Sequence, residues 1–597
     1  MRQTLDFLLY DWLRVQELQS RERFSEHSRE TFDAVLDTCE KIAREKFAPF
    51  NRQCDVEEPH FDGERVHLPA ATKIALDAYV ESGMLAADQD YEFGGMQLPC
   101  VIERAANAFF AKASVAMGGY AMLTHGNARL LMAHGTAKQK EVFARAEFAG
   151  RWFGTMCLSE PQAGSSLSDV ATRALPDGAD FESDALGPRY RLKGHKMWIS
   201  GGEHELSENI IHLVLAKIPG PDGKPLPGTK GISLFIVPKH CVDAEGRLTG
   251  QRNDVQLAGL NHKLGYRGTT NCLLNFGEKD GAIGYLVGQP GEGLKCMFHM
   301  MNEARIGVGM GAVMLGYAGY EASLEYAKQR PQGRPVGPGG KDASQPQRPI
   351  IEHADVRRML LAQKSYVEGG LALELFCARL VDERHGGSDA DKARAALLLE
   401  VLIPIAKSWP SEWCLEANSL AIQVLGGYGY TRDFPVEQYW RDNRLNMIHE
   451  GTHGIQALDL LGRKVVMNGG SALLALAGRI NETVERGLQS APHAKLANEL
   501  AAALARIGRA TKAAWASGEP EAALANATPY MQAFGHVVLA WLWLDLALTA
   551  QGDSDFALGK HAAARYFFAF ELPKIGGWLE AVEKGEGLSR EVRAEWL

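Results

Sequence analysis

The sequence predicts a mainly α-helical protein with a β domain inserted between helical parts. In the first 150 residues, apolar side chains recur every three or four positions, as in TFDAVLDTCEKIAREKFAPF, which is the period of an amphipathic helix. From about residue 155 to residue 285 the pattern changes to short apolar or alternating runs separated by Gly, Pro and Asp, which indicates strands. The helical period then returns and continues along the rest of the chain.

We expect four parts in chain order, because 597 residues exceed the roughly 250 to 300 residues at which a single hydrophobic core stops growing. They are an N-terminal helical domain (1–154), a middle β domain (155–285), a C-terminal helical domain (286–466) and an additional helical domain (467–597). Glycines at 307, 309, 311, 316 and 319 lie within one helical pattern. Because each would cost roughly 1 kcal/mol in an exposed helix, they predict close packing between helices.

Composition narrows the range of partners and compartments. Apolar residues at 46%, charged residues at 23% and a net charge of -9 are typical of a soluble globular protein and argue against nucleic acid as a partner. The nine cysteines include no C-x-x-C pair, which favours buried thiols in a reducing compartment over disulfides. We therefore expect a cytoplasmic protein.

Two apolar stretches bear on whether the protein is exported or inserted into a membrane. The start, MRQTLDFLLYDWLRVQELQ, mixes charges into its apolar residues and lacks the uninterrupted apolar core of a signal peptide. The window from His536 to Ala550 contains Asp545 and is shorter than the ~20 residues that span a bilayer. We expect it to be a buried helix without stable membrane insertion, with contact to a membrane surface as the alternative.

One short stretch matches the H-E-x-x-H pattern of zinc peptidases: His449, Glu450, Gly451, Thr452 and His453. In those enzymes the motif lies on one helix, so that both histidines bind the metal and the glutamate acts on its water. Gly451 and Thr452 are poor residues for a helix interior. A zinc hydrolase using His449, Glu450 and His453 stays as an alternative of another class. In a purely structural interpretation, Thr452 caps the next helix and Glu450 favours its N-terminus.

Four segments in the same order resemble the acyl-CoA dehydrogenase family. They are CLSEPQAGSSLSDVATRA, KGHKMWISGG, LNHKLGYRGTTNCLLNF with NEARIGVGMGAVMLGYA, and AIQVLGGYGYTRDFPVEQYWRDNRLNMIHEGTHGIQ. The length, PIIEHADVRRMLL and KHAAARYFFAFELPKIGGWLEAVEKGE resemble the longer subgroup that includes 3-methylmercaptopropionyl-CoA dehydrogenase. The resemblance implies an N-terminal helical domain, a β-barrel-like middle domain, a C-terminal helical bundle and an extra C-terminal helical domain.

The resemblance implies a flavoenzyme that uses FAD to oxidise an acyl-CoA thioester to the trans-2-enoyl-CoA. Glu450 would remove the α-proton, flavin N5 would take the β-hydride, and an electron-transfer flavoprotein would receive the electrons. Such a base must be ionised and lie in a site dry enough to raise its pKa toward the working pH. The N–H of Glu450 would help to polarise the thioester carbonyl, and Gly451 would let the substrate approach the backbone.

Further site residues follow from the resemblance alone. For the flavin ring they are Met156, Leu158, Ser159, Trp198 and Ser200. For the dinucleotide tail they are Arg330, Gln332, Gln423, Gly426, Gly427 and Thr452. For CoA and the acyl group they are Ser165, Asn302, Arg305 and Tyr120. Because the tail site of one subunit borrows residues from another, the resemblance implies an oligomer, either a homodimer or a dimer of dimers.

Several alternatives stay open. Taken alone, Trp198 also fits a core aromatic on a strand, and Arg305 fits a charge on an exposed helix face. Ser166, Gly333 with Arg334, and His449 differ from the residues that the family commonly has at those places. An acyl-CoA oxidase of the same fold, which passes electrons to oxygen, is the close rival, and a non-catalytic member of the fold is another. The acyl chain is not defined.

Overall fold

The computed structural model describes residues 1–597 apart from the side chains of His299, Asn302 and Glu303. The chain divides into two compact units built from separated segments. Unit 1 comprises Met1–Arg29, Pro99–Ala108 and Arg305–Leu597, and unit 2 comprises Glu30–Leu98 and Phe109–Ala304. Two long helices, α5 (Cys100–His134) and α8 (Gly293–Gln329), contribute residues to both units.

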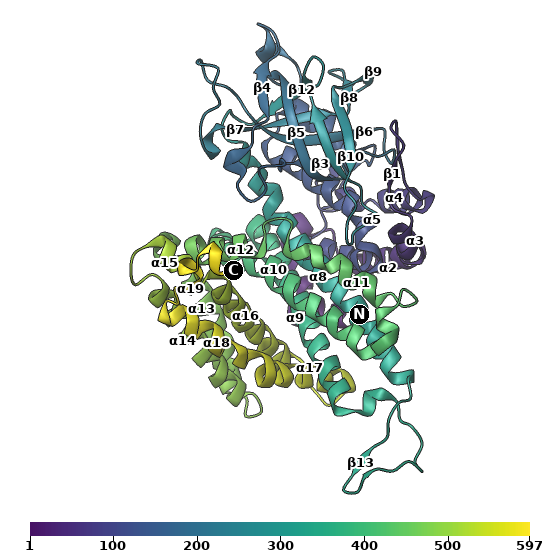
Figure 1. Ribbon diagram of the computed structural model, residues 1–597, viewed down its shortest axis with the longest axis vertical. Helices are drawn as coiled ribbons and strands as arrows, with labels where there is room; N and C mark the ends of the chain where they lie inside the picture. The colour runs from purple at the N-terminus through teal and green to yellow at the C-terminus, as the bar shows by residue number, and fades with distance from the viewer. The chain divides into compact units, whose positions relative to one another are not determined.

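Unit 2 contains the β domain that the sequence predicts (Figure 1). Its strands are β1 (His60–Phe61), β2 (Val66–His67), β3 (Trp152–Cys157), β4 (Arg173–Pro176), β5 (Arg189–Ser200), β6 (Asn209–Lys217), β7 (Ile232–Pro238), β8 (His240–Val242), β9 (Leu248–Arg252), β10 (Val255–Leu260), β11 (Asn271–Phe276) and β12 (Ala282–Val287). The main sheet has eight strands in the order β10-β11-β5-β12-β7-β6-β3, and β4 pairs with β5 and β6. The inserted β domain is confirmed.

The strand sequences follow from how the two faces of this sheet are covered. All residues of β6 (NIIHLVLAK) are buried, and such continuous apolar runs are typical of strands covered on both sides. Alternate side chains serve opposite faces. Leu213 belongs to a cluster with Leu131 and Phe143 from the helical segments, whereas Val214 joins a cluster with Phe235 on the other face.

The helices of unit 2 precede the sheet in the chain, except for the first part of α8. They are α2 (Arg29–Ile42), α3 (Asn51–Val56), α4 (Ala70–Glu81), the later part of α5, α6 (Ala137–Gln139) and α7 (Arg145–Phe148).

Unit 1 is helical apart from a small hairpin of β13 (Val336–Gly337) and β14 (Gly340–Lys341). Its helices are α1 (Arg2–Asp6), the later part of α8, α9 (Ala354–Gly386), α10 (Asp389–Leu425), α11 (Val436–Asn443), α12 (His453–Asp459), α13 (Met467–Leu488), α14 (Ala494–Ala514), α15 (Pro520–Leu524), α16 (Ala527–Thr549), α17 (Asp555–Tyr566), α18 (Ile575–Lys584) and α19 (Leu588–Glu591). Ser388 begins α10 with a capping box to Asp391. Because only two residues separate α9 from α10 and the two helices pack together, they form a helical hairpin.

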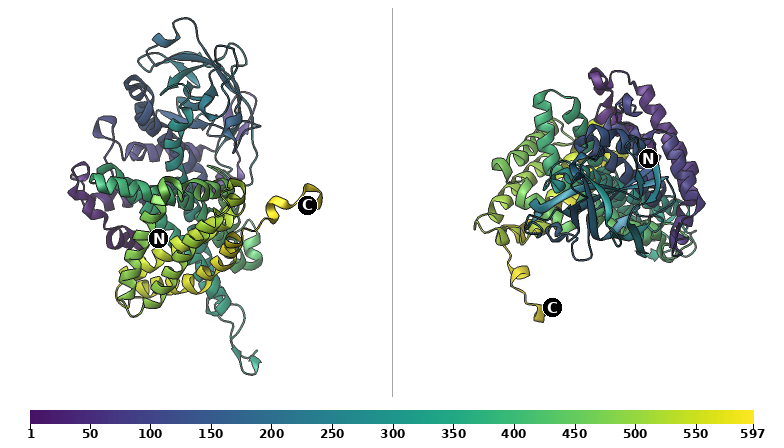
Figure 2. Two further views of the ribbon diagram at one scale, coloured as in Figure 1. Left: turned by 90° about the vertical axis from the view of Figure 1, so that its left-hand side faces the viewer. Right: turned by 90° about the horizontal axis from the view of Figure 1, so that it is seen from above.

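The additional C-terminal helices pack around α16 (Figure 2, light green to yellow). This helix is long and apolar enough to cross a membrane, but 89% of its most apolar window is buried inside the protein. Trp541 and Trp543 on it are fully buried. A helix that is apolar all round belongs to a core when other helices cover it, so the prediction of a buried helix is confirmed.

The first and last parts of the chain meet inside unit 1. Lys560 on α17 donates to Glu368 on α9 at 2.8 Å and to Thr4 at 3.3 Å. Trp12 Nε1 donates to Asp545 on α16 at 2.8 Å. These groups are buried or partly buried, so the C-terminal helices supply polar partners to Thr4 and Trp12 of the N-terminal segment.

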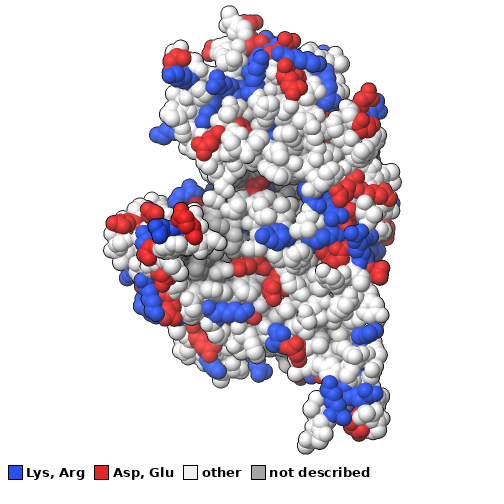
Figure 3. All heavy atoms as spheres, viewed as in Figure 1, with Lys and Arg blue, Asp and Glu red and all other residues white. Residues whose placement is uncertain are grey.

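Charged side chains of both signs are intermingled on the face drawn in Figure 3. Exposed pairs such as Arg479 with Glu482 and Lys584 with Glu580 occur within single helical turns. Such exposed pairs contribute little to stability, because solvent screens them. All nine cysteines are free and buried, as predicted from their spacing.

Close helix packing at the glycines of α8 is confirmed. A Cβ atom at Gly316 would lie 2.8 Å from Cβ of Cys414 on α10, and one at Gly319 would lie 2.6 Å from Asn418 Nδ2. Both distances are shorter than ordinary van der Waals contact. The glycines let α8 lie directly against α10, which carries groups of the candidate site.

We expect Gly316→Ala to lower the free energy of unfolding by about 1 to 3 kcal/mol, because the added methyl group forces α8 and α10 apart. Gly478→Ala on α13 is the matched control, since nothing lies within 4 Å of its Cβ position, and alanine there should be neutral or stabilising by up to about 1 kcal/mol. Chemical denaturation of both variants measures the difference. Equal stability of the two variants would contradict this account of the packing.

Candidate active site

Glu450 lies in a short turn between the 3-10 helix η14 (Arg444–Met447) and α12. Glu450 and its neighbour Gly451 both have left-handed backbone, with φ of 53° and 89°. A non-glycine residue rarely adopts this conformation, and it often marks a functional site when surrounding contacts enforce it. The segment from His449 to His453 is therefore not one continuous helix, which a zinc site of the H-E-x-x-H type requires.

Two side chains hold the backbone of this turn. Gln456 Nε2 donates to the carbonyl oxygen of Glu450 at 2.9 Å, and Lys407 Nζ on α10 donates to the carbonyl oxygen of Gly451 at 2.7 Å. A Cβ atom at Gly451 would meet Gln456 Nε2 at 2.5 Å. Glycine is thus required here by its positive φ and by lack of space.

The charge on Glu450 is balanced between burial and two cations. Burial raises the pKa of the Glu450 carboxyl, while Arg305 and Lys407 act to lower it. Arg305 on α8 is only 5% exposed and pairs with Asp459 Oδ2 at 3.5 Å. A carboxylate with a raised pKa next to cations is suited to accept a proton while starting from the ionised form.

The two histidines of the motif have separate partners. His449 Nε2 lies 3.0 Å from Asn446 Oδ1, and burial lowers the pKa of His449 to about 3. His453 Nε2 lies 3.0 Å from Glu412 Oε2 on α10. In the part of the chain that the structure describes, no group of three or more His, Cys, Asp and Glu side chains is placed to hold a metal ion.

Thr452 caps α12, as the structural interpretation of this stretch predicts. Its Oγ1 accepts a hydrogen bond from the N–H of Ile455 at 3.3 Å. A threonine N-cap typically contributes about 1 kcal/mol to helix stability. A contact between Thr452 and FAD stays a prediction.

Unit 1 also brings together the two segments predicted for the dinucleotide tail. The guanidinium of Arg330 lies 5.3 Å from the ring centre of Tyr428, which follows the C-terminus of α10. Gln332 accepts a hydrogen bond at its carbonyl oxygen from His353 Nε2, 2.7 Å away. The residues predicted for the tail site in these segments are all exposed in the single chain: Arg330, Gln332, Gln423, Gly426 and Gly427. Their contact with a cofactor stays a prediction.

In unit 2, the two segments predicted for the flavin ring lie side by side. The N–H of Met197 donates to the carbonyl oxygen of Ser159 at 3.0 Å, and Lys196 Nζ donates to the carbonyl oxygen of Leu158 at 3.0 Å. Trp198 is 58% exposed and has a φ of 66°, so the alternative of a core aromatic is wrong. An exposed indole on strained backbone is suited to stack on a flat ring.

The remaining predicted residues have varied surroundings. Ser200 Oγ accepts a hydrogen bond from Asn271 Nδ2 at 3.3 Å, Met156 is half-buried and Ser165 is exposed. The alternative that Arg305 is a charge on an exposed helix face is wrong, since it is buried. The side chain of Asn302 lies outside the described residues. The predicted contacts of these residues with ligands stay predictions.

A buried ion pair that the motif analysis missed supports the flavin segments. Lys196, which is fully buried, donates to Glu160 Oε1 at 2.9 Å. Burial opposes ionisation of Glu160, but Lys196 and hydrogen bonds from Thr172 and Ala171 outweigh it and lower the pKa of Glu160 to about 2. Glu160 and Lys196 stand within the two motifs, CLSEP and KMWIS, so their pairing joins the two segments predicted for the flavin ring.

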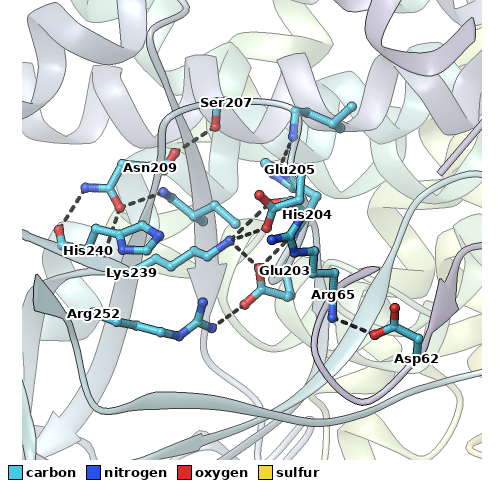
Figure 4. A network of polar contacts seen from close by, with 12 residues as sticks. Asp62, Arg65, Glu203, His204, Glu205, Ser207, Asn209, Lys239, His240 and Arg252 are labelled. Carbon is cyan, nitrogen blue, oxygen red and sulfur yellow. Dashed lines mark hydrogen bonds and ion pairs between the residues drawn. The ribbon is translucent and has the colours of Figure 1, made fainter. Parts of the chain in front are cut away.

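The loop after β5 is fixed by a second charged network (Figure 4). Lys239 lies between Glu203 and Glu205 and is 3.2 Å from the Glu205 carboxylate. Arg252 Nη2 donates to Glu203 Oε2 at 2.8 Å. Lys196 of the Lys196–Glu160 pair lies just before the WISGGEH segment in the sequence, and this network lies at the end of that segment. The segment is therefore held at both ends.

Tyr120 lies in the core of unit 2 next to this loop. It is 2% exposed, and its ring centre lies 5.3 Å from that of His204. Its hydroxyl donates to the carbonyl oxygen of Gly268 at 3.2 Å and accepts from the N–H of Thr270 at 2.9 Å. These contacts give Tyr120 a structural role, and its part in an acyl pocket stays a prediction.

Comparison with known proteins bears directly on this arrangement. Residues 29–150 match the family model described as Acyl-CoA dehydrogenase, N-terminal domain, residues 341–465 match Acyl-CoA dehydrogenase, C-terminal domain, and residues 476–590 match Acetyl-CoA dehydrogenase C-terminal like. The chain is 37% identical to a 3-methylmercaptopropionyl-CoA dehydrogenase of Ruegeria pomeroyi, over 94% of this chain and 93% of that protein. The chain belongs to the acyl-CoA dehydrogenase family.

Two further similarities extend this result. A butyryl-CoA dehydrogenase of Syntrophomonas wolfei is 32% identical over 97% of this chain and 96% of its own length. The crystal structure of an acyl-CoA dehydrogenase complexed with FAD from Bacillus anthracis has a TM-score of 0.74 at 19% identity, covering 95% of this chain and 90% of that one. The acyl-CoA dehydrogenase fold, including the extra C-terminal domain, is confirmed. Proteins with these names are oxidoreductases, and this chain is an enzyme of that family.

We expect Lys196→Met to destabilise the protein by about 3 to 5 kcal/mol, because it leaves the Glu160 carboxylate buried without its cation. Lys193→Met on the same strand is the matched control, since Lys193 is exposed, and it should change stability by at most about 0.5 kcal/mol. Thermal unfolding compares the two variants. A Lys196→Met protein as stable as the control would show that the pair does not hold the two motifs together.

Proposed function

We propose that the protein catalyses the FAD-dependent α,β-dehydrogenation of an acyl-CoA thioester to the trans-2-enoyl-CoA. Family membership supports the reaction class, and the turn at Glu450 supports the assignment of the base. The observation that carries the proposal is a carboxyl group with a burial-raised pKa on a left-handed turn, near Arg305 and Lys407. Burial increases basicity, while the two cations keep the group ionised.

Glu450 removes the α-proton of the thioester in this proposal. Its backbone is held because Gln456 binds the carbonyl oxygen of Glu450 and Lys407 binds the carbonyl oxygen of Gly451. Its N–H polarises the thioester carbonyl as negative charge develops on the oxygen. FAD, when bound, supplies the acceptor for the β-hydride.

The residues present fit the cofactor by their chemistry. Trp198 offers an exposed ring and Ser159 lies on the neighbouring segment for the isoalloxazine, while Arg330 offers an exposed cation for a pyrophosphate. We propose that the exposed tail residues belong to a homodimer or a dimer of dimers, and that the protein works in the cytoplasm with an electron-transfer flavoprotein as acceptor.

The acyl group is best sought among short chains, because relatives include enzymes named for 3-methylmercaptopropionyl-CoA and butyryl-CoA. An acyl-CoA oxidase of the same fold is the second candidate. Reoxidation by air separates the two, since an oxidase with reduced flavin regains its yellow colour rapidly in aerated buffer and a dehydrogenase does so slowly.

We expect Glu450→Gln to lower kcat by at least about 1000-fold, because the amide keeps the shape of the side chain and cannot accept the proton. The experiment uses a panel of short and medium acyl-CoA substrates with an artificial electron acceptor. Glu482→Gln is the matched control, since its side chain lies on the surface of α13 and pairs with Arg479, and it should keep wild-type activity.

Flavin absorbance of the Glu450→Gln protein should equal that of the wild type, because the substitution leaves the cofactor segments unchanged. Full activity of this variant with every substrate that the wild type oxidises would refute the assignment of the base. A colourless, chelator-sensitive protein that contains zinc would instead favour the hydrolase.

A further inference from the structure

Lys407 is a fully buried lysine in the middle of a long helix. It stands in the apolar stretch VLIPIAKSWP of α10, between Pro404 and Pro410, and none of its surface is exposed. A lysine is almost never fully buried unless its ammonium group is paired or hydrogen-bonded. Its hydrogen-bond acceptor is the carbonyl oxygen of Gly451, 2.7 Å from Nζ.

This bond connects a rigid helix to the residue that follows the base. Glu450 and Gly451 both have positive φ, and for a non-glycine residue that backbone costs of order 1 to 3 kcal/mol unless contacts enforce it. Gln456 binds the Glu450 carbonyl from α12, and Lys407 binds the Gly451 carbonyl from α10. The turn is therefore held from two helices, and only one of the two groups carries a charge.

The positive charge of Lys407 shifts the pKa values of two neighbouring side chains on the turn. It lowers the pKa of Glu450 together with Arg305 from α8, and it lowers the pKa of His449 on the same turn. The pKa of Lys407 itself is lowered to about 7, mainly by burial. The negative charge of Glu450 raises this pKa, and the positive charge of Arg305 lowers it further. The further charges that act on Arg305 are Asp459, Arg463 and Glu400.

Resting on the function proposed above, we propose that Lys407 is a positioning residue for the base: its ammonium group fixes the Glu450–Gly451 turn through the Gly451 carbonyl and its positive charge favours the Glu450 carboxylate. A neutral donor at this place would supply the hydrogen bond alone. Arg305, the other cation near Glu450, pairs with Asp459 Oδ2 at 3.5 Å.

The two tasks have different consequences for pH dependence. Only ionised Glu450 can remove a proton, so kcat/KM rises with pH as Glu450 loses its proton, and the midpoint of this acidic limb reports Glu450 in the free enzyme. A nearby positive charge favours the ionised carboxylate. Removing that charge therefore moves the midpoint to higher pH, whereas loosening the turn alone lowers activity equally at every pH.

The test is the pH profile of kcat/KM for the FAD-loaded full chain with an acyl-CoA that the wild type oxidises. For Lys407→Met and Lys407→Gln we expect the acidic midpoint to rise by about one pH unit, so that activity on that limb falls about tenfold. The glutamine variant should lose less activity than the methionine variant at high pH, because its amide can still donate to Gly451. Lys407→Arg should return the midpoint toward the wild-type value.

Lys392→Met is the matched control, because it makes the same substitution on the same helix at a lysine with 44% of its side chain exposed, and its profile should equal that of the wild type. Flavin absorbance and thermal unfolding show whether each variant is folded, and the glutamine variant serves if the methionine variant is not. An unchanged midpoint in a folded Lys407→Gln protein would overturn the proposal.

The same measurements separate this inference from the function on which it rests. If Glu450→Gln is inactive and the midpoint of the Lys407 variants does not move, only the role of Lys407 is refuted. If Glu450→Gln is active, the proposed base is refuted, and the role of Lys407 with it.

Discussion

A base that removes a proton from carbon has to be dry enough to be basic and still ionised when the substrate arrives. In the turn at Glu450, partial burial and two cations act on these two demands. Burial raises the pKa of the carboxyl, while Arg305 and Lys407 limit the rise. The left-handed backbone of this turn is enforced by groups on α10 and α12, and rigid helices hold a site more accurately than a loop can by itself. The close approach of α8 to α10 at Gly316 fixes the helix that carries Arg305 against the helix that carries Lys407.

Much of the fold could be predicted because it depends on the local period of apolar residues along the chain. The change from a helical period to short apolar runs locates the β domain, the glycines of α8 predict its close packing, and Asp545 with the length of its window predicts a buried helix. The H-E-G-T-H stretch shows how far local pattern extends to a site. Its glycine and threonine are unsuitable for one continuous helix, and in the structure Gly451 is part of the turn while Thr452 begins α12.

The rest of the site depends on contacts between distant residues. Lys407 and Gly451 are separated by 44 positions, and Lys196 and Glu160 by 36, so a single sequence gives no reason to pair them. The only local sign is a lysine within an apolar stretch, which is compatible with a surface position as well as with burial. Trp198 shows the opposite case. An aromatic residue on a strand suggests a core position, but the Trp198 side chain is exposed. The division into two units also escapes local pattern, because each unit is built from separated segments.

The contacts between the chain ends also bear on biosynthesis. Thr4 is separated from Lys560 by 556 positions, and Trp12 from Asp545 by 533. On the ribosome the N-terminal segment is made first, at about 5 to 20 residues per second, so Thr4 and Trp12 have to wait for at least about half a minute before Lys560 and Asp545 exist. During this time unit 1 is incomplete, while unit 2, which ends at Ala304, can already be whole. The additional C-terminal helices are thus the last step in closing the unit that carries the base, and a ribosome that stops early would release a chain without a finished active site.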